Sequence, residues 1–399
     1  MVTQTQLNKH DFSINLQRFP TKSSDKSLRA WDAADEYLID QLVESVNLAD
    51  IKTIIVINDS FGALCCAIQA LAPHIKIDTF TDSYMSKLGI QNNINNNAPL
   101  TGKNTHITVN SSLDFNSKLN KADIVLLKVP RTLAYLDYLL AQLRLYLSND
   151  TKILAGGMVK LITSSVVKLF EKHFPGTKTS LAKKKARLLI SASCDEIENA
   201  GTSDNYKVNI SQVKDEELGF TLYNWPNVFC REQVDIGARF LLKTLINYDF
   251  AQKNIIDLGC GNGILGVSVL QRSPNTHMVF VDESFMAIAS AKQTLAQAAV
   301  DDVSNAAEFY VNHCLSNITL KSVDAVLCNP PFHQQSTVTE DIAWQMFKDA
   351  YKVLKPRGQF FVVGNRHLDH HIKLKKLFGN CKAIASNAKF VVLLASKSI

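Results

Sequence analysis

Short apolar runs alternate with longer amphipathic stretches along most of this 399-residue chain. The runs are rich in Val, Ile and Leu, and the longer stretches, such as residues 133–147 and 287–299, repeat apolar residues at helical spacing. Strands that are covered on both faces of a parallel sheet give continuous apolar runs, and helices usually connect them. The pattern therefore predicts an α/β protein built from doubly wound parallel sheets.

The chain also resembles itself at a spacing of about 200 residues, which indicates that a whole domain was duplicated. Segments of the first half match segments of the second half in the same order: 55–64 with 256–265, 81–83 with 281–283, 123–131 with 324–332 and 152–157 with 359–364. Two tandem Rossmann-like domains are therefore predicted. The second is predicted to end differently from the first, in an antiparallel hairpin, because apolar runs at 381–386 and 389–396 flank a short turn containing Asn.

Changes in composition suggest where the domains begin and end. Residues 1–50 are interpreted as an extended arm followed by a helix from about residue 27 to residue 46. Residues 51–194 are then the first α/β domain, and residues 216–399 are the second. The stretch between them, 195–215, is polar, acidic and rich in turn residues, and it is assigned to a linker.

A glycine-rich segment directly follows the apolar run at 254–256. Its pattern is Asp-x-Gly-x-Gly-x-Gly, formed by Asp257, Gly259, Gly261 and Gly263. Glycines let a backbone turn sharply and approach a ligand closely, and the next helix presents free N–H groups there. The same letters also fit a dinucleotide-binding fingerprint. The acid at the end of the strand favours a cationic sulfonium ligand such as S-adenosylmethionine, because a carboxylate would repel a pyrophosphate.

Polar residues end the next two strands. Asp282 follows an apolar run, where its carboxylate can accept hydrogen bonds from two ribose hydroxyls. The alternative role of Asp282 is to cap the helix that begins near residue 284. Asn312 or His313 ends a third strand and is expected to lie beside the adenine, and the sequence does not distinguish between the two.

A second motif, formed by Asn329, Pro330, Pro331 and Phe332, follows the apolar run at 324–328. It lies 72 residues after Asp257, a spacing that predicts a place at the carboxyl edge of the neighbouring strand. The Asn329 side-chain oxygen and the Pro330 carbonyl can hold the protons of a conjugated amino group, which is otherwise a poor nucleophile. Phe332 offers a ring on which a flipped base can stack. A rigid Pro-Pro turn without function is the alternative for the motif taken alone.

The first half lacks both motifs. Residues 58–61 lack the early glycines, and residues 128–131 lack the Asn, one proline and the aromatic ring, so this copy is predicted not to bind cofactor in the same way. Residues 51–194 are instead basic, with 18 Lys and Arg against 8 Asp and Glu. We interpret the first half as a degenerate, RNA-binding domain, with phosphate contacts expected from Lys183, Lys184, Lys185 and Arg187. A solvated surface turn is the alternative for this cluster.

The remaining composition argues against other classes. No stretch approaches the roughly 20 uncharged apolar residues of a membrane helix, and the N-terminus has no signal pattern, so a soluble cytoplasmic protein is expected. The eight cysteines form no C-x-x-C pair and are expected to be free thiols. Few acidic residues and no cysteines accompany the histidines at 367, 370 and 371, so surface histidines are expected rather than a metal site.

With these motifs in place, the sequence resembles the guanine-N2 methyltransferases of bacterial ribosomal RNA over nearly its whole length. The resemblance is carried by residues 16–20, 30–38, 227–231, 235–242, 329–333 and 365–368. The arm and the helix with Trp31 are more similar to the large-subunit members of this family than to the small-subunit members. Cys230 stands where a serine is usual and Asp369-His370 stand where Pro-Tyr is usual, and neither departure is expected to touch the chemistry.

The resemblance implies a seven-stranded catalytic domain that uses S-adenosylmethionine and no metal, and a degenerate N-terminal domain. It implies that the acceptor is the N2 amino group of a guanine in 23S rRNA, nucleotide 1835 in the RNA numbering. A guanine of 16S rRNA, a DNA amino group and a protein glutamine remain alternative acceptors. The intact motifs of the second half argue against a non-catalytic RNA-binding protein.

Overall fold

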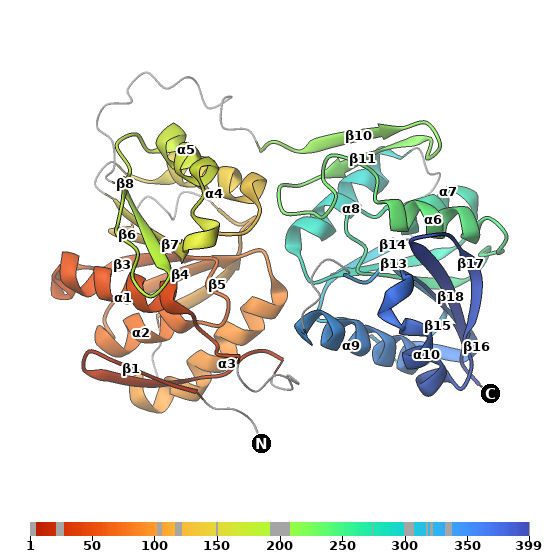
Figure 1. Cartoon of the computed structure of the whole chain (residues 1–399), viewed down its shortest axis with the longest axis horizontal. Helices are drawn as coiled ribbons and strands as arrows, with labels where there is room; N and C mark the ends of the chain where they lie inside the picture. The colour runs from red at the N-terminus through yellow and green to blue at the C-terminus, as the bar shows by residue number, and fades with distance from the viewer. Residues whose placement is uncertain are drawn as a thin grey trace. The chain divides into compact units, whose positions relative to one another are not determined.

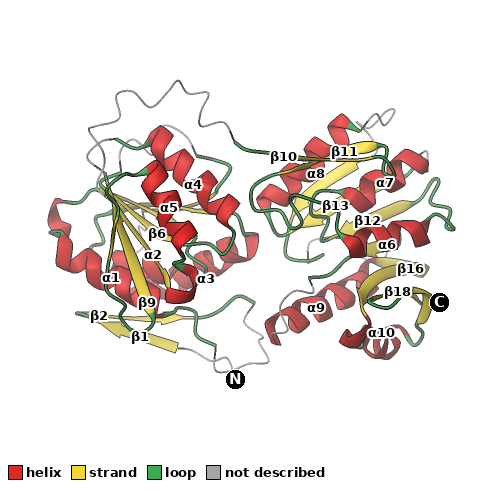
Figure 2. Ribbon diagram, turned by 45° about the horizontal axis from the view of Figure 1, so that its top comes forward, coloured by secondary structure: helices red, strands yellow, loops and turns green. Residues whose placement is uncertain are grey.

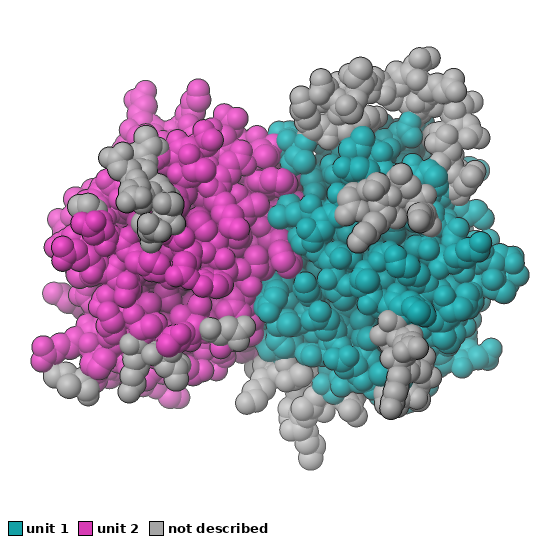
Figure 3. Space-filling view, turned by 180° about the vertical axis from the view of Figure 1, so that it is seen from behind, with its two compact units in different colours: residues 1–22, 26–209 teal, residues 23–25, 210–399 magenta. Residues whose placement is uncertain are grey.

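The structure is a computed structural model, and it describes residues 5–20, 28–101, 106–115, 122–148, 151–191, 208–273, 275–298, 307–316, 318–319, 322–331 and 337–398. The chain forms two compact units, one reaching residue 209 and the other starting at residue 210 (Figure 3). Of the predicted linker at 195–215, residues up to 207 lie outside the described residues, and residues 211–215 form a strand.

The second unit is built on a seven-stranded sheet with the strand order β14-β13-β12-β15-β16-β18-β17 (Figure 1). Five of the strands are parallel: β12 (Asn254–Leu258), β13 (His277–Asp282), β14 (Ala307–Val311), β15 (Val323–Cys328) and β16 (Leu354–Asn365). An antiparallel hairpin of β17 (Lys382–Ser386) and β18 (Phe390–Ser396) completes the sheet, as predicted. The order reverses between β12 and β15, and in sheets of this kind the carboxyl ends of such strands border the ligand crevice.

Helices cover both faces of this sheet (Figure 2). On one face lie α6 (Ile236–Leu245), α7 (Ile264–Arg272) and α8 (Phe285–Gln297), and on the other lie α9 (Thr337–Val353) and α10 (His370–Phe378). Within β12, Ile255 packs against the helices of the first face and Ile256 packs against those of the other face. Because consecutive side chains are buried on opposite faces, the strand reads as a continuous apolar run.

The first unit repeats this architecture, with the order β5-β4-β3-β6-β7-β9-β8. Its strands are β3 (Thr53–Ile57), β4 (Lys76–Thr81), β5 (Ile107–Ser111), β6 (Ile124–Lys128), β7 (Lys152–Met158), β8 (Lys178–Thr179) and β9 (Ala186–Ser191). Its helices are α1 (Ala33–Ser45), α2 (Ala63–Leu71), α3 (Tyr84–Thr101), α4 (Leu133–Tyr146) and α5 (Ser164–His173). The predicted fold of two tandem doubly wound domains is confirmed.

The first unit also ends in an antiparallel hairpin, which the sequence predicted only for the second. Strand β9 pairs antiparallel with both β7 and β8. The hairpin escaped prediction because β8 has only two residues, both exposed and polar, and so carries no apolar pattern.

The N-terminal arm is a β hairpin rather than an extended segment. Strands β1 (Thr5–Lys9) and β2 (Phe12–Leu16) pair antiparallel, as do β10 (Ser211–Asp215) and β11 (Phe220–Asn224) at the start of the second unit. In each unit this hairpin is followed by a helix, α1 or α6, and then by the sheet. The duplication therefore extends to β1, β2 and α1, which the sequence comparison had left outside it.

Each hairpin is fixed by side-chain to backbone hydrogen bonds from the equivalent helix. In the first unit, Asn93 and Asn97 of α3 accept from the backbone N–H groups of Gln17 at 2.9 Å and Asn15 at 3.0 Å. In the second, hydroxyls of α8 accept from the N–H groups that end β11, at 2.9 and 3.0 Å. The same docking position recurs although the side chains differ.

In the part of the chain that the structure describes, no helix is long and apolar enough to span a membrane. The described cysteines are all free thiols, and Cys194 lies outside the described residues.

Candidate active site

The glycine loop connects β12 to α7 in the second unit. Gly259, Gly261 and Gly263 have φ values of 72°, 55° and 82°, a region that side chains with a Cβ adopt with strain. At Gly263, the first residue before α7, a Cβ would lie only 3.0 Å from the Cβ of Ala291 on α8. The predicted glycines are thus required both by the turn and by the close packing of two helices.

Asp257, the acid before this loop, is completely buried. Its Oδ2 accepts a hydrogen bond from the backbone N–H of Gly266 at 2.9 Å, while its Oδ1 is buried without a partner among the described residues. Burial raises the pKa of this carboxyl to about 7. A buried carboxylate oxygen with an unused acceptor position suits a cationic ligand, which is what a sulfonium with an aminoacyl group provides.

Asp282 ends β13 and is tied to the same loop. Its Oδ2 accepts from the N–H of Gly261 at 2.9 Å, and its Oδ1 accepts from the N–H of Ser284 at 3.0 Å. The N-cap of α8 is Ser284, whose hydroxyl accepts from the N–H of Ala287. Asp282 therefore is not the cap of that helix, and burial raises its pKa. Its role towards a ribose stays a prediction.

Asn312 and His313 follow β14, as expected. The backbone N–H of Asn312 donates to the carbonyl of Asp282 at 2.9 Å, and its side-chain oxygen accepts from Ser316 at 3.0 Å. His313 is half-buried, and burial lowers its pKa, so it is neutral near pH 7. Both residues lie at the strand end beside Asp282, and the choice between them as the adenine contact stays open.

Asn329 follows β15, the strand next to β12. The two strands pair with Leu258 opposite Cys328, so Gly259 and Asn329 leave the sheet side by side. The Nδ2 of Asn329 donates to the Oδ2 of Asp235 at 2.9 Å, whereas its Oδ1 is buried without a partner among the described residues. Pro330 is buried and Pro331 is exposed, and Phe332 lies outside the described residues.

A loop before α6 contacts both halves of this site, and the sequence assigned no role to it. Asn224 at its start accepts from the side chain of Asn262 in the glycine loop at 2.8 Å, and Asp235 at its end holds Asn329. Cys230 donates through its Sγ to the Oδ1 of Asp235 at 3.7 Å. Cys230 therefore contacts the residue that holds Asn329, and the expectation that its replacement of the usual serine leaves the chemistry untouched stays a prediction.

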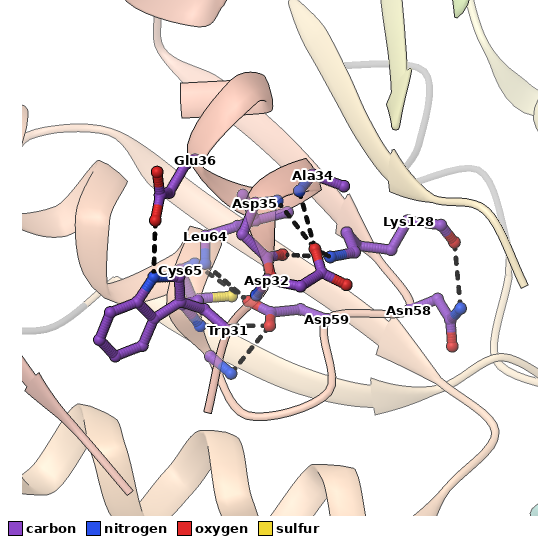
Figure 4. Close-up of polar contacts among 12 residues, drawn as sticks. Trp31, Asp32, Ala34, Asp35, Glu36, Asn58, Asp59, Leu64, Cys65 and Lys128 are labelled. Atoms are coloured by element: carbon purple, nitrogen blue, oxygen red, sulfur yellow. Dashed lines mark hydrogen bonds and ion pairs between the residues drawn. The ribbon is translucent and has the colours of Figure 1, made fainter. Parts of the chain in front are cut away.

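The equivalent positions of the first unit are filled by the chain's own charges (Figure 4). The carboxylate of Asp59 accepts from four backbone N–H groups at the start of α2, at 2.9 to 3.2 Å. Lys128, which follows the pattern of Asn329, lies 2.8 Å from Asp32 and 2.7 Å from Asp35. Burial raises the pKa of Asp35 to about 6. Asp59 thus occupies the N–H groups at the start of α2 that a ligand would need, and Lys128 is engaged by two acids.

The predicted RNA contacts are only partly free. Lys183 and Lys184 lie in the turn between β8 and β9 and pair with Asp40 at 2.8 Å and Glu36 at 2.9 Å. Lys185 is exposed, and Arg187 is half-buried on β9. The structure thus gathers three lysines on one turn but balances two of them with acids of α1.

The histidines differ from the expectation in one respect. His370 is buried on α10, with its ring edge to face with that of Phe347 at 5.2 Å, so it is not a surface residue. Among the described residues no group of three or more His, Cys, Asp or Glu side chains is arranged to hold a metal ion.

Both units match known families. Residues 4–196 match the family described as RLMG N-terminal domain, and residues 219–394 match the family described as Methyltransferase small domain. Proteins named ribosomal RNA large subunit methyltransferase G are similar over the full length. The protein of Pseudoalteromonas translucida is 43% identical, covering 100% of this chain and 99% of its own, and that of Vibrio campbellii is 42% identical, covering 99% and 98%.

Among solved structures, a 16S rRNA N2 G1207 methyltransferase of T. thermophilus, in complex with AdoMet and guanosine, has the same fold. The match has a TM-score of 0.76 and covers 99% of this chain and 98% of that one. The sequences are 17% identical, so the likeness concerns the fold of both units.

Proposed function

The chain belongs to the ribosomal RNA large subunit methyltransferase G family, and from this premise we propose that it methylates the N2 amino group of a guanine in 23S rRNA, nucleotide 1835 in the RNA numbering. It is an S-adenosylmethionine-dependent methyltransferase. We propose further that it acts on this RNA in the cytoplasm.

The single observation that carries the proposal is the unpaired Oδ1 of Asn329. A buried polar atom without a partner costs about 1 to 3 kcal/mol, so a ligand that fills the position is favoured. Among the described residues Nδ2 is engaged by Asp235 and Oδ1 is without a partner, which leaves the oxygen as an acceptor for a ligand. An exocyclic amino group, which is a hydrogen-bond donor, fits that position.

The cofactor would be held by Asp257 and Asp282 on either side of the glycine loop, with Asn312 or His313 beside the adenine. When bound, its sulfonium supplies an electrophilic methyl group. The Oδ1 of Asn329 and the carbonyl of Pro330 would accept hydrogen bonds from the two N–H groups of the guanine amino group. These hydrogen bonds favour a tetrahedral nitrogen, whose lone pair is no longer conjugated with the base ring. The same oxygens stabilise the positive charge that develops on nitrogen during methyl transfer.

The test of the acceptor site is Asn329→Ala in the full chain. Removing one preorganised acceptor should lower the single-turnover rate on 23S rRNA about a hundredfold, or roughly 3 kcal/mol, while cofactor and RNA affinities stay nearly unchanged. Phe332→Ala should also raise the RNA concentration needed, because base stacking is worth about 1 to 3 kcal/mol. Wild-type turnover in Asn329→Ala would mean that another group holds the amine.

The acceptor itself is tested by mass spectrometry of rRNA from a strain that lacks the gene. Loss of one methylguanine from 23S rRNA, restored by the wild-type gene and not by Asn329→Ala, is expected. Loss of a methyl group from 16S rRNA, from DNA or from a protein glutamine would favour the corresponding alternative instead.

A further inference from the structure

The side-chain amide of Asn329 donates from Nδ2 to the carboxylate of Asp235 at 2.9 Å. We propose that Asp235 is a positioning residue, which fixes the amide so that Oδ1 faces the amino group to be methylated and Nδ2 faces away. This inference rests on the proposed function of Asn329. It assigns a role to a residue 94 positions earlier in the sequence.

The chemistry of the pair allows only one orientation. The two ends of an amide side chain have nearly the same shape, so the hydrogen-bond partners decide which end points where. An ionised carboxylate only accepts, and the 2.9 Å contact to its Oδ2 therefore requires Nδ2 on that side. A flipped amide would place two oxygens against each other and would present N–H groups to an amine that also donates.

Asp235 is itself held in place by the start of α6. It is the N-cap of that helix, and its Oδ2 also accepts from the backbone N–H of Ala238 at 2.7 Å. Its Oδ1 accepts from Cys230. The partial positive charge at a helix N-terminus stabilises an ionised carboxylate. The side chain that orients Asn329 is thus itself held by two contacts, one to each carboxylate oxygen.

Gly237, on the first turn of α6, leaves room for this arrangement. A Cβ at residue 237 would lie 3.1 Å from the Oδ2 of Asp235 and 3.4 Å from the Oδ1 of Asn329. Such a Cβ would be tight against the carboxylate that holds Asn329, and it would lie in contact with the oxygen that we assign to the acceptor. The absence of a Cβ keeps the approach to Oδ1 open on the side of α6.

The first unit provides an internal comparison. Asp32 is the N-cap of α1 as Asp235 is of α6, and it too contacts the residue that aligns with Asn329, which is Lys128 at the end of β6 (Figure 4). Lysine has three donors and no acceptor, so this pair is a structural ion pair with nothing to offer an amine. Both units thus place an N-cap aspartate against this position, and among the described residues only the second unit has an acceptor without a partner there.

The test compares two substitutions that both keep the helix cap. Ser and Asn cap helices about as well as Asp, but Ser is too short to reach Asn329. Asp235→Ser should lower the single-turnover rate at saturating cofactor and RNA by at least about tenfold, with both dissociation constants unchanged. Asp235→Asn should restore most of the rate, because its amide oxygen can accept from both Ala238 and Asn329.

Asp32→Ser is the matched control, since it removes the same kind of contact in the first unit and should leave the rate unchanged. A merely structural role of Asp235 predicts equal rates for the Ser and Asn variants. Equal rates, or a wild-type rate in Asp235→Ser, would overturn the proposal. In an Asn329→Ala background, Asp235→Ser should cause no further loss, because two residues that act as a unit are not additive.

A second measurement does not depend on the substrate. The side-chain NH2 signal of Asn329, identified by its absence from Asn329→Ala, should be protected from solvent exchange in the wild type and in Asp235→Asn, but not in Asp235→Ser. Unchanged protection in Asp235→Ser would refute the contact. If protection is lost as expected while Asn329→Ala keeps full turnover, the positioning holds and the proposed function of Asn329 fails.

Discussion

Two residues of the second unit, Asp257 and Asn329, are alike in how their side chains are used. Each has one end engaged by the chain at 2.9 Å, with Gly266 or with Asp235, and each has an oxygen that is buried without a partner among the described residues. Natural proteins satisfy most buried polar groups, so two such atoms at the carboxyl ends of neighbouring strands are candidate ligand contacts. One oxygen is suited to the cation of the cofactor, and the other is suited to the amine of the acceptor.

The raised pKa of Asp257 leads to a pH dependence of cofactor binding. The folded carboxyl has a pKa of about 7, above its ordinary value of 3.8, because of its burial. Without cofactor the folded chain therefore keeps the proton more tightly than the unfolded chain. This contribution to the free energy of unfolding is full below pH 3.8 and is lost as the pH rises to about 7.

A cationic ligand favours the ionised form, so we expect binding of S-adenosylmethionine near pH 6 to release up to about one proton, and affinity to rise towards pH 7 and then level off. Calorimetry in two buffers with different ionisation enthalpies measures the proton release. Asp257→Asn cannot ionise and should release none. Equal heats in the two buffers for the wild type would contradict this assignment.

The sequence was sufficient to single out those residues of the candidate site that are close together in a motif. Asp257 and Gly259 to Gly263 stand within seven positions, and Asn329 begins a recognisable turn. Asp235 could not be found in this way, because an Asp before a helix is a common cap and its partner lies 94 residues away. Only the folding of α6 beside β15 joins the two.

At the scale of elements, the first unit keeps the strands and helices of the second but closes the ligand-binding turn with its own side chains. Asn58 has a φ of 62°, where Gly259 has 72°, so the turn is retained without the glycine. The carboxylate of Asp59 then takes the position of an anion at the start of α2. An internal cap therefore occupies these N–H groups.

Removing this cap should destabilise the first unit. Asp59→Ala leaves four buried N–H groups without their acceptor, and we expect a loss of at least about 2 kcal/mol of unfolding free energy. Asp59→Asn keeps one oxygen and should lose less. Urea denaturation of the wild type and the two variants measures both losses, and cofactor affinity should not change. An unaltered midpoint for Asp59→Ala would show that water replaces the carboxylate at little cost.

The β8–β9 turn permits a test of RNA binding in two directions. Neutralising Lys183, Lys184 and Lys185 should weaken RNA binding, and each lost phosphate contact should lower the slope of log K against log salt by about 0.7 to 0.9. Neutralising Glu36 should strengthen binding, because it frees Lys184 from its acid at 2.9 Å. Arg187 is kept in this test because it is half-buried.

Filter binding over a range of salt concentrations gives both slopes. If the slope is unchanged in the lysine variant and affinity is unchanged in Glu36→Gln, the turn is a solvated surface with no part in binding.

The sequence predicted the elements of the sheets better than the elements around them. Buried parallel strands leave apolar runs that can be matched between the two halves, as residues 123–131 and 324–332 show. The hairpins β1–β2 and β10–β11 are short and half-exposed, with polar residues at alternate positions, and they share few letters. Their equivalence follows from the order of elements and from their docking on α3 and α8.

At the scale of the whole molecule, the duplication has separated two tasks between units that each have their own core. We propose that the second unit holds the cofactor and the reacting amine, and that the first provides most of the RNA affinity. Phosphate contacts supply most of the affinity of such complexes and need no cofactor machinery. A degenerate copy can therefore keep the fold and lose the glycine loop without cost to this role.

Separating the two units tests this division. Residues 210–399 alone should bind S-adenosylmethionine as the full chain does, because Asp257, Asp282 and the core around β12 all belong to that unit. The fragment should methylate 23S rRNA only at much higher RNA concentrations, because the link to the first unit, which raises the local concentration of substrate, is gone. Adding residues 1–209 as a separate chain should not restore the rate, since a tether cannot be supplied in trans.

The first unit alone should bind RNA and fail to bind cofactor, because its own carboxylate, that of Asp59, occupies the N–H groups at the start of α2. Calorimetry for the cofactor and filter binding for the RNA measure these affinities. Full RNA affinity in residues 210–399 would assign substrate binding to the catalytic unit and leave the basic first unit without its proposed role.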